Sequence, residues 1–264
     1  MLYFIKLGGS LITNKFKPHT ARYHVINRLA IEIKRALQDI PELQLLIGHG
    51  SGSFGHIPGK EFNTREGVKT KEDWRGFIQV WKEAHALNEI VVNSLLSQQI
   101  PVIPFPPSAG IYTDKMKVIS CNTDPMRKAM SEGIIPIVYG DVVFDKTMGG
   151  TILSTEEIFV HLNDIFRPQK ILLAGIEEGV WEDYPQRHNM INKITPKSLK
   201  SQQGIINSSN APDVTGGMAT KVQLMTSLVE NNPQLEIITF SGAKPNNLYE
   251  ALIGKSIGTS ITKN

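Results

Sequence analysis

The order of apolar and amphipathic segments predicts an α/β protein built on a mainly parallel central sheet. Short apolar runs typical of buried strands lie at residues 2–7, 43–47, 134–139, 170–174 and 236–240. The first two are separated by residues 23–37, where apolar side chains recur with the 3.6-residue period of an amphipathic helix. Alternation of strand and helix along a chain is typical of a parallel sheet with crossover helices.

The remaining elements follow from the same periodicities and from the positions of glycine and proline. Further helices are expected at residues 74–97, 123–131, 154–162, 213–229 and 248–253, the third of them opening with Ser154 and Glu157 as a capping box. Shorter strands are expected at residues 101–105 and 257–261, with a hairpin of residues 142–144 and 149–153. Residues 57–72 are expected to form an exposed loop or hairpin, and residues 183–212 a loop with one short helix.

Composition narrows the class of protein. The 264 residues are 41% hydrophobic and 20% charged, with a net charge of +3, and no cluster of Lys and Arg indicates nucleic-acid binding. Cys121 is the single cysteine, which excludes internal disulfides and cysteine-based zinc sites. No apolar run approaches the roughly 18 residues of a membrane span, and the N-terminal run is too short for a signal peptide. We therefore expect a cytoplasmic protein without membrane contact.

The most informative loop follows the second apolar run. Its glycines, in the spacing Gly50-x-Gly52-x-x-Gly55, let backbone N–H groups approach an anion closely, and His56 adds a hydrogen-bond donor for a phosphate oxygen. The same spacing matches the dinucleotide-binding fingerprint of NAD-linked dehydrogenases, which opens directly into a helix. Because residues 56–59 are His-Ile-Pro-Gly, we expect no helix there and disfavour that alternative.

Three lysines, Lys6, Lys15 and Lys221, lie in or beside glycine turns. A single exposed lysine is usually only solvated, but three beside such turns suggest cations directed at phosphates. Phosphoryl transfer is driven mainly by positioning and by neutralisation of charge on the transferred group. The chain contains neither the P-loop pattern nor the catalytic-loop signature of protein kinases. Loops at the carboxyl ends of parallel strands are where α/β proteins bind ligands.

Several motifs match one known family in the same order along nearly the whole chain. They are Lys6-Leu7-Gly8-Gly9-Ser10, Lys15, His49-Gly50-Ser51-Gly52-Ser53-Phe54-Gly55-His56, Tyr139-Gly140-Asp141, and Thr215-Gly216-Gly217-Met218 with Lys221. Together they resemble the amino acid kinase superfamily and, within it, the isopentenyl phosphate kinases. The loop ending in His56 is the most specific match, because it is shared with fosfomycin kinases but differs in acetylglutamate and uridylate kinases.

The resemblance implies a three-layer αβα sandwich formed by a single domain, residues 1–264. An acceptor-binding lobe would occupy about residues 1–165 and a nucleotide-binding lobe about residues 166–264. The implied reaction converts isopentenyl phosphate and ATP to isopentenyl diphosphate and ADP, a step of isoprenoid precursor biosynthesis, with Mg²⁺ as cofactor. The resemblance also implies a homodimer. It assigns no metal-ligating residue.

The resemblance also implies roles for individual residues. Lys6 and Lys221 would contact the ATP phosphates, and Lys15 would stabilise the transferring group. His56 would hold the acceptor phosphate, helped by Ser51 and Thr155. Backbone contacts to the nucleotide phosphates are implied for Gly8, Gly9, Ser10, Gly52 and Gly217. Gly175 and Gly179 are also expected at the nucleotide site.

Three departures from the family pattern fall in these motifs. Ser51 replaces the middle of three glycines, which it can do if its φ is not positive. Glu156 replaces an aspartate that orients the catalytic lysines in relatives, and would do so with a longer side chain. Residues 175–179, Gly-Ile-Glu-Glu-Gly, replace the usual Thr-Asp-Val-Asp-Gly, so the adenine and ribose contacts cannot be assigned.

The acceptor and the activity itself leave alternatives open. Trp74, Phe77, Ile78 and Trp81 form an apolar stripe that either packs in the core or lines a pocket for an apolar substrate tail. An apolar tail favours isopentenyl phosphate over a small phosphonate, the acceptor of a fosfomycin-like kinase. A non-catalytic nucleotide-binding protein of the same fold is the third reading, and the retained lysines and His56 argue against it.

Overall fold

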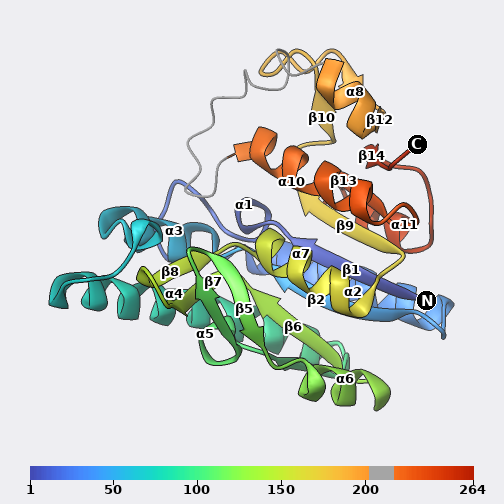
Figure 1. Cartoon of the computed structure of the whole chain (residues 1–264). Helices are drawn as coiled ribbons and strands as arrows, with labels where there is room; N and C mark the ends of the chain where they lie inside the picture. Colours follow the sequence, from blue (N-terminus) through green and yellow to red (C-terminus); the bar gives the residue numbers. More distant parts are fainter. Residues whose placement is uncertain (202–216) are drawn as a thin grey trace.

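The computed structural model describes residues 1–201 and 217–264, and within them an eight-stranded sheet forms the centre of the molecule (Figure 1). Its strand order is β12-β14-β13-β9-β1-β2-β6-β3. The bounds are β1 Leu2–Leu7, β2 Gln44–His49, β3 Val102–Pro104, β6 Ile135–Tyr139, β9 Lys170–Gly175, β12 Lys193–Ile194, β13 Glu236–Ser241 and β14 Thr259–Ile261. Neighbouring strands run parallel except β13 and β14, so the predicted α/β class with a mainly parallel sheet is confirmed.

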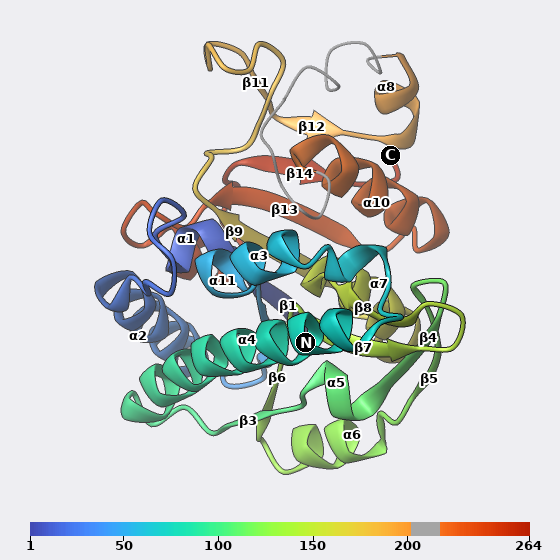
Figure 2. The same cartoon turned by 90° about the vertical axis from the view of Figure 1, so that its left-hand side faces the viewer.

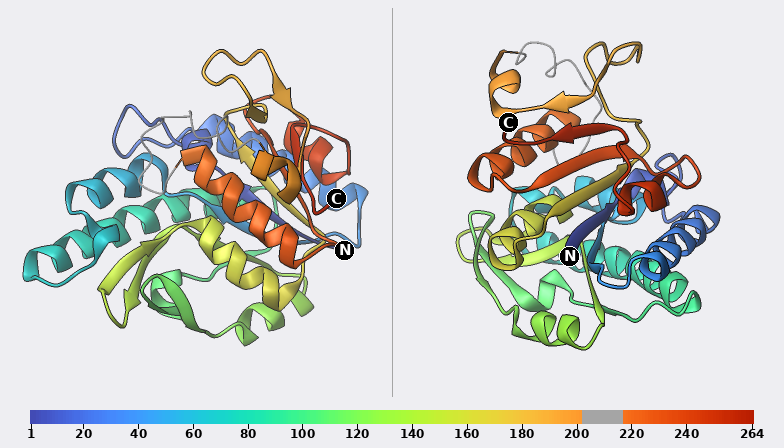
Figure 3. Two further views of the ribbon diagram at one scale, coloured as in Figure 1. Left: turned by 45° about the horizontal axis from the view of Figure 1, so that its top comes forward. Right: turned by 90° about the vertical axis from the view of Figure 1, so that its right-hand side faces the viewer.

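Helices cover both faces of this sheet, as Figure 3 shows with α7 and α10 on one side and α2 on the other. The helices are α1 Gly9–Ile12, α2 Tyr23–Asp39, α3 Gly52–Glu61, α4 Lys71–Ser97, α5 Pro107–Gly110, α6 Asp124–Ser131, α7 Thr155–Phe166, α8 Pro196–Ser201, α10 Gly217–Asn231 and α11 Asn247–Leu252. Alternation along β1 separates the layers: Ile5 joins the core under α2 and α4, whereas Phe4 packs on Phe159 of α7. The three-layer αβα sandwich is confirmed. None of the helices in the described residues combines the length and apolar character needed to cross a membrane.

A smaller sheet lies beside α4, at the end of the molecule remote from β12 (Figure 2). Its order is β5-β4-β7-β8, with β4 Ile111–Asp114, β5 Lys117–Cys121, β7 Asp141–Asp145 and β8 Gly149–Leu153. The predicted hairpin of residues 142–153 is confirmed as β7 and β8, which pair antiparallel. Asp145 closes its turn by accepting hydrogen bonds from the N–H groups of Thr147 and Met148 and from the Thr113 hydroxyl. Two further short strands, β10 Val180–Trp181 and β11 Met190–Ile191, form a separate hairpin.

The expectation of a loop over residues 57–72 is wrong. Helix α3 begins at Gly52, within the glycine motif itself, and a 3₁₀ turn, η1, follows at Thr64–Glu66. Gly59 lies against Val80 of α4 and Ile152 of β8, a close approach that packing stabilises although the local sequence disfavours a helix. The expected lack of a helix after these glycines was used above against a dinucleotide-binding fingerprint, and that argument is therefore wrong. The strand order still differs from that of dinucleotide-binding folds.

Candidate active site

Two glycine loops form the floor of the candidate site, at the carboxyl ends of the neighbouring strands β1 and β2. The loops touch backbone to backbone, because a Cβ on Gly9 would lie 2.5 Å from the N atom of Gly52. Gly52 has a φ of +52°, and its Cβ would lie 2.2 Å from the Thr13 hydroxyl. Both positions therefore require glycine. Ser51 between them has a φ of −73°, so serine is accommodated without strain.

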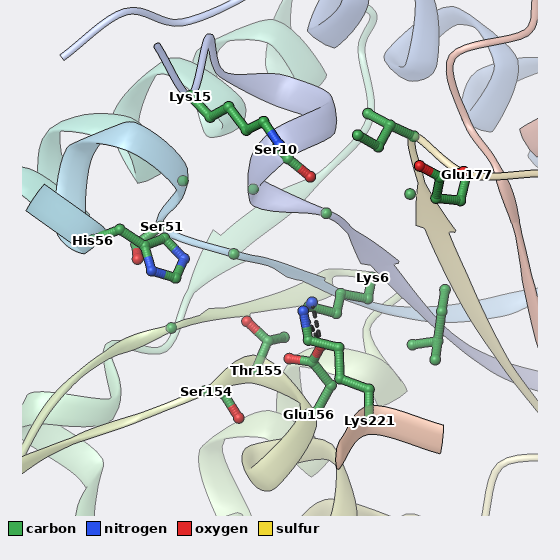
Figure 4. A pocket seen from close by; sticks show the side chains of 18 of the residues that line it. Lys6, Ser10, Lys15, Ser51, His56, Ser154, Thr155, Glu156, Glu177 and Lys221 are labelled. Carbon is green, nitrogen blue, oxygen red and sulfur yellow. Dashed lines mark hydrogen bonds and ion pairs between the residues drawn. The ribbon is translucent and has the colours of Figure 1, made fainter. Parts of the chain in front are cut away.

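A cavity of about 1100 Å³ opens above these loops. It is lined by residues from both glycine loops, from α3, α7 and α10, and from the hairpin after β9. The cavity brings together most of the expected site residues (Figure 4): Lys6, Gly8, Gly9, Ser10, Lys15, Ser51, Gly52, His56, Thr155, Glu156, Gly175, Gly179 and Lys221. Gly217 is the first residue of α10, but its surroundings, like Thr215 and Gly216, lie outside the described part of the chain.

Glu156 holds two lysines from distant segments at one point of this cavity. Its Oε1 lies 2.5 Å from Lys6 Nζ and 3.7 Å from Lys221 Nζ, and its side chain is 5% exposed (Figure 4). Burial acts to raise the pKa of this carboxyl, but the two lysines more than offset it and the pKa is lowered. Glu156 is therefore a carboxylate at neutral pH. Glutamate thus gathers both ammonium groups, the geometry expected of the family aspartate.

The first turn of α7 places Glu156. Ser154 is the N-cap, and Glu157 completes a capping box with it, as the sequence predicts. Thr155 differs from expectation, because its buried hydroxyl donates to the carbonyl oxygen of His49 at 2.6 Å. A threonine has one hydroxyl proton, so this one is not directed at an acceptor phosphate. Its side chain instead joins α7 to the end of β2.

The two histidines of the central loop have different environments. His56, on α3, points into the cavity (Figure 4). His49 is fully buried, stacks on Tyr139 with ring centroids 5.3 Å apart, and shares a hydrogen bond with Asn88. Burial lowers the pKa of His49 to about 4, so its ring is neutral at physiological pH. Only His56 is placed to contact a phosphate in the cavity.

The half of the cavity beside the β10–β11 hairpin contains residues that the sequence motifs did not identify. Glu177 accepts hydrogen bonds from Arg187 Nε and Nη2, both at 2.8 Å, and from Trp181 Nε1 at 3.2 Å. Arg187 lies over the ring of Tyr184, 4.8 Å from its centroid. The hydrogen bonds from Arg187 are the main cause of a lowered pKa at Glu177. The departure of residues 175–179 from the family motif pointed to this region of the chain. The residues that contact Glu177, however, come from the β10–β11 hairpin that follows.

The other half of the cavity has an apolar wall made by Ile57 of α3, Val80 of α4 and Ile152 of β8. The apolar stripe of α4 was expected to line a substrate pocket, and this expectation is wrong. None of its four members lines the cavity: Trp74, Phe77, Ile78 and Trp81.

The stripe is divided between an interior cluster and the surface. Phe77 is buried with Val80 and Ile152 and packs against Trp74, so it lies behind the wall. Ile78 and Trp81 are 59% and 41% exposed. The face of α4 that turns toward the hairpin of β7 and β8 thus presents Val80, not the larger aromatic side chains, to the cavity.

Comparison with known proteins identifies the family. The model of the amino acid kinase family matches residues 1–239. The chain belongs to this family. It is 30% identical to isopentenyl phosphate kinase of Methanocaldococcus jannaschii over 99% of this chain and 98% of that protein. It is 32% identical to isopentenyl phosphate kinase of Methanothermobacter thermautotrophicus over 99% of both.

The fold of this amino acid kinase agrees with a solved structure of an isopentenyl phosphate kinase. An X-ray structure of isopentenyl phosphate kinase superimposes with a TM-score of 0.83 at 28% identity, covering 99% of this chain and 100% of that one. The resemblance found in the sequence motifs is therefore confirmed.

Proposed function

We propose that this chain transfers the γ-phosphoryl group of ATP to isopentenyl phosphate, giving isopentenyl diphosphate and ADP. The observation that carries the proposal is one cavity lined by Lys6, Lys15, Lys221 and His56 together with an apolar wall. Relatives that match along their full length are isopentenyl phosphate kinases.

Charge is the main obstacle to this reaction, because the acceptor is itself a phosphate. Three lysines and the imidazole of His56 line the space where the two phosphate-bearing molecules would meet. Such groups offset the repulsion most effectively in a site that excludes water. A phosphate monoester oxygen is already a nucleophile, so no general base is required. Glu156, bound to two lysines, keeps their ammonium groups directed at the same point.

The apolar wall indicates the acceptor class. Ile57, Val80 and Ile152 offer aliphatic surface to a short hydrocarbon tail, whereas a small polar acceptor would gain little from it. His56, from the same helix as Ile57, would then hold the phosphate at the head of that tail. We propose an acceptor-binding half built from residues before about 165 and a nucleotide half built from residues after it.

ATP would place its phosphates over the glycine loops and its base toward α10, where Val222 and Met225 line the crevice. Mg²⁺ is expected to accompany ATP, since magnesium is commonly held by substrate phosphates and few protein ligands. Among the described residues, no group of three or more His, Cys, Asp or Glu could hold a metal ion. We therefore assign no protein ligand to Mg²⁺. A cytoplasmic homodimer is also proposed.

Initial rates of ADP release with a panel of acceptors test the function. We expect turnover with isopentenyl phosphate at least 100-fold above that with fosfomycin or N-acetylglutamate, judged by kcat/KM. Turnover of fosfomycin alone would favour the phosphonate kinase alternative. Nucleotide binding without ADP release for any acceptor would favour a non-catalytic protein. Light scattering after size exclusion tests the dimer.

A further inference from the structure

Arg65 joins the turn η1 to the end of strand β8 and to the start of helix α7. It lies in η1, between α3 and α4, and its side chain is 18% exposed. Its Nη1 donates to the carbonyl oxygen of Ile152 at 2.8 Å and to Glu157 Oε2 at 3.2 Å. Its Nη2 donates to Glu157 Oε1 at 2.8 Å. A guanidinium is well suited to this arrangement, because its planar fork pairs with both carboxylate oxygens while another N–H reaches a carbonyl.

Glu157 uses the same carboxylate to hold the start of α7. Its Oε2 accepts hydrogen bonds from the N–H and the hydroxyl of Ser154, both at 2.7 Å. Arg65 therefore fixes the carboxylate that caps the helix. Glu156 precedes Glu157 in the same helical turn, and its carboxylate contacts Lys6 and Lys221. A rotation or fraying of this turn would move Glu156 relative to both lysines.

The other contacts of Arg65 lead to the acceptor half of the cavity. Ile152, whose carbonyl it binds, lines the apolar wall. The Thr151 hydroxyl donates to the backbone carbonyl of Arg65 at 2.8 Å, so η1 and β8 are joined in both directions. Arg65 also closely follows α3, which carries His56.

We propose that Arg65 is a positioning residue for phosphoryl transfer, acting through Glu157 on the turn that presents Glu156 to the two lysines. It sets that turn relative to the acceptor wall at Ile152. This role rests on the proposed kinase function. An exposed ion pair would contribute little, but this pair is partly buried, paired through two hydrogen bonds, and shares its guanidinium with a backbone carbonyl.

The experiment is a double-mutant cycle with kcat and KM measured for isopentenyl phosphate and ATP. Arg65→Ala should lower kcat about tenfold while KM for ATP stays within twofold, because the lysines remain but are less well held. Glu157→Gln, which keeps the length and one acceptor oxygen, should lower kcat about threefold. The double variant should be no slower than Arg65→Ala, since both changes break one connection. Arg65→Lys should recover only part of the loss.

A matched control and a folding readout separate this role from general stability. Arg75 and Glu72 form an ion pair on α4 with side chains 77% and 64% exposed, so Arg75→Ala should leave kcat unchanged. Circular dichroism and the active-site concentration, from a burst or tight-binding titration, correct kcat for unfolded protein. Should Arg65→Ala fail to fold, Glu157→Gln and Arg65→Lys carry the same test.

The possible results are distinguishable. No turnover by the wild-type chain would refute the proposed function itself. Wild-type turnover with a folded Arg65→Ala of unchanged kcat would overturn the positioning role alone, and so would a thirtyfold loss in the double variant, the product of independent effects. A lowered melting temperature with unchanged kcat per folded molecule would likewise make Arg65 merely structural.

Discussion

Replacing Glu156 by glutamine removes the charge that gathers Lys6 and Lys221. At an effective dielectric constant of about 20, the contacts at 2.5 and 3.7 Å correspond to raw attractions of roughly 7 and 4 kcal/mol. Much of this is offset by taking the charges out of water, and breaking a buried pair by removing one partner costs about 3–5 kcal/mol. If about 3 kcal/mol of that is lost from the transition state, kcat falls about 10²-fold.

The assay is ADP release at saturating ATP and isopentenyl phosphate, with thermal unfolding measured in parallel. The pKa of Glu156 is lowered in the folded chain, so its stabilising contribution is complete above the ordinary carboxyl pKa. That contribution disappears as the pH falls through the lower, folded-state value. The difference in melting temperature between wild type and Glu156→Gln should therefore shrink in acid. A kcat within threefold of wild type, or a difference independent of pH, would refute this reasoning.

Three further changes test other parts of the account. His56→Ala should lower kcat about 10²-fold or more, the scale of losing one transition-state donor. As a control, His24→Ala on the exposed face of α2 should leave kcat unchanged. A loss under threefold for His56→Ala would mean that His56 is merely structural. Ile152→Ala should let longer prenyl phosphates into the cavity, measured as kcat/KM against chain length, and an unchanged preference would place the tail elsewhere. Asp145→Ala should lower the free energy of unfolding by roughly 2 kcal/mol in denaturant titrations at pH 7, because donors from β4, the β4–β5 turn and the β7–β8 turn lose their acceptor. An unchanged midpoint would contradict this.

Apart from β12, the strands of the sheet were predictable because they are apolar runs that are mostly buried. Strand β12 was missed, because it lies in the polar residues 183–212 that were expected to form a loop with one short helix. Helix α3 was not, because its sequence contains Gly55, Pro58 and Gly59, and the packing of α3 against α4 and β8 overrides that weak propensity. Strands β4 and β5 were also missed. In β5 most residues are exposed, so no apolar periodicity marks it.

The charged part of the site was predictable because its lysines and His56 stand beside glycine turns within recognisable motifs. The walls were not, since they are assembled from segments far apart along the chain. On α4 the larger apolar side chains were expected to line the pocket. Instead Phe77 fills the core behind the wall, and the smaller Val80 faces the cavity. Arg187 had no signal, because it reaches Glu177 only through the fold of the β10–β11 hairpin.

We propose that one cavity brings two phosphate-bearing molecules together and that a phosphoryl group passes between them there. Phosphorus-31 NMR of the wild-type chain with ATP, Mg²⁺ and isopentenyl phosphate tests it most directly. We expect ADP and a new organic diphosphate to appear in equal amounts as the monophosphate signal disappears. ADP accompanied by inorganic phosphate alone, or an unchanged monophosphate signal, would contradict the account.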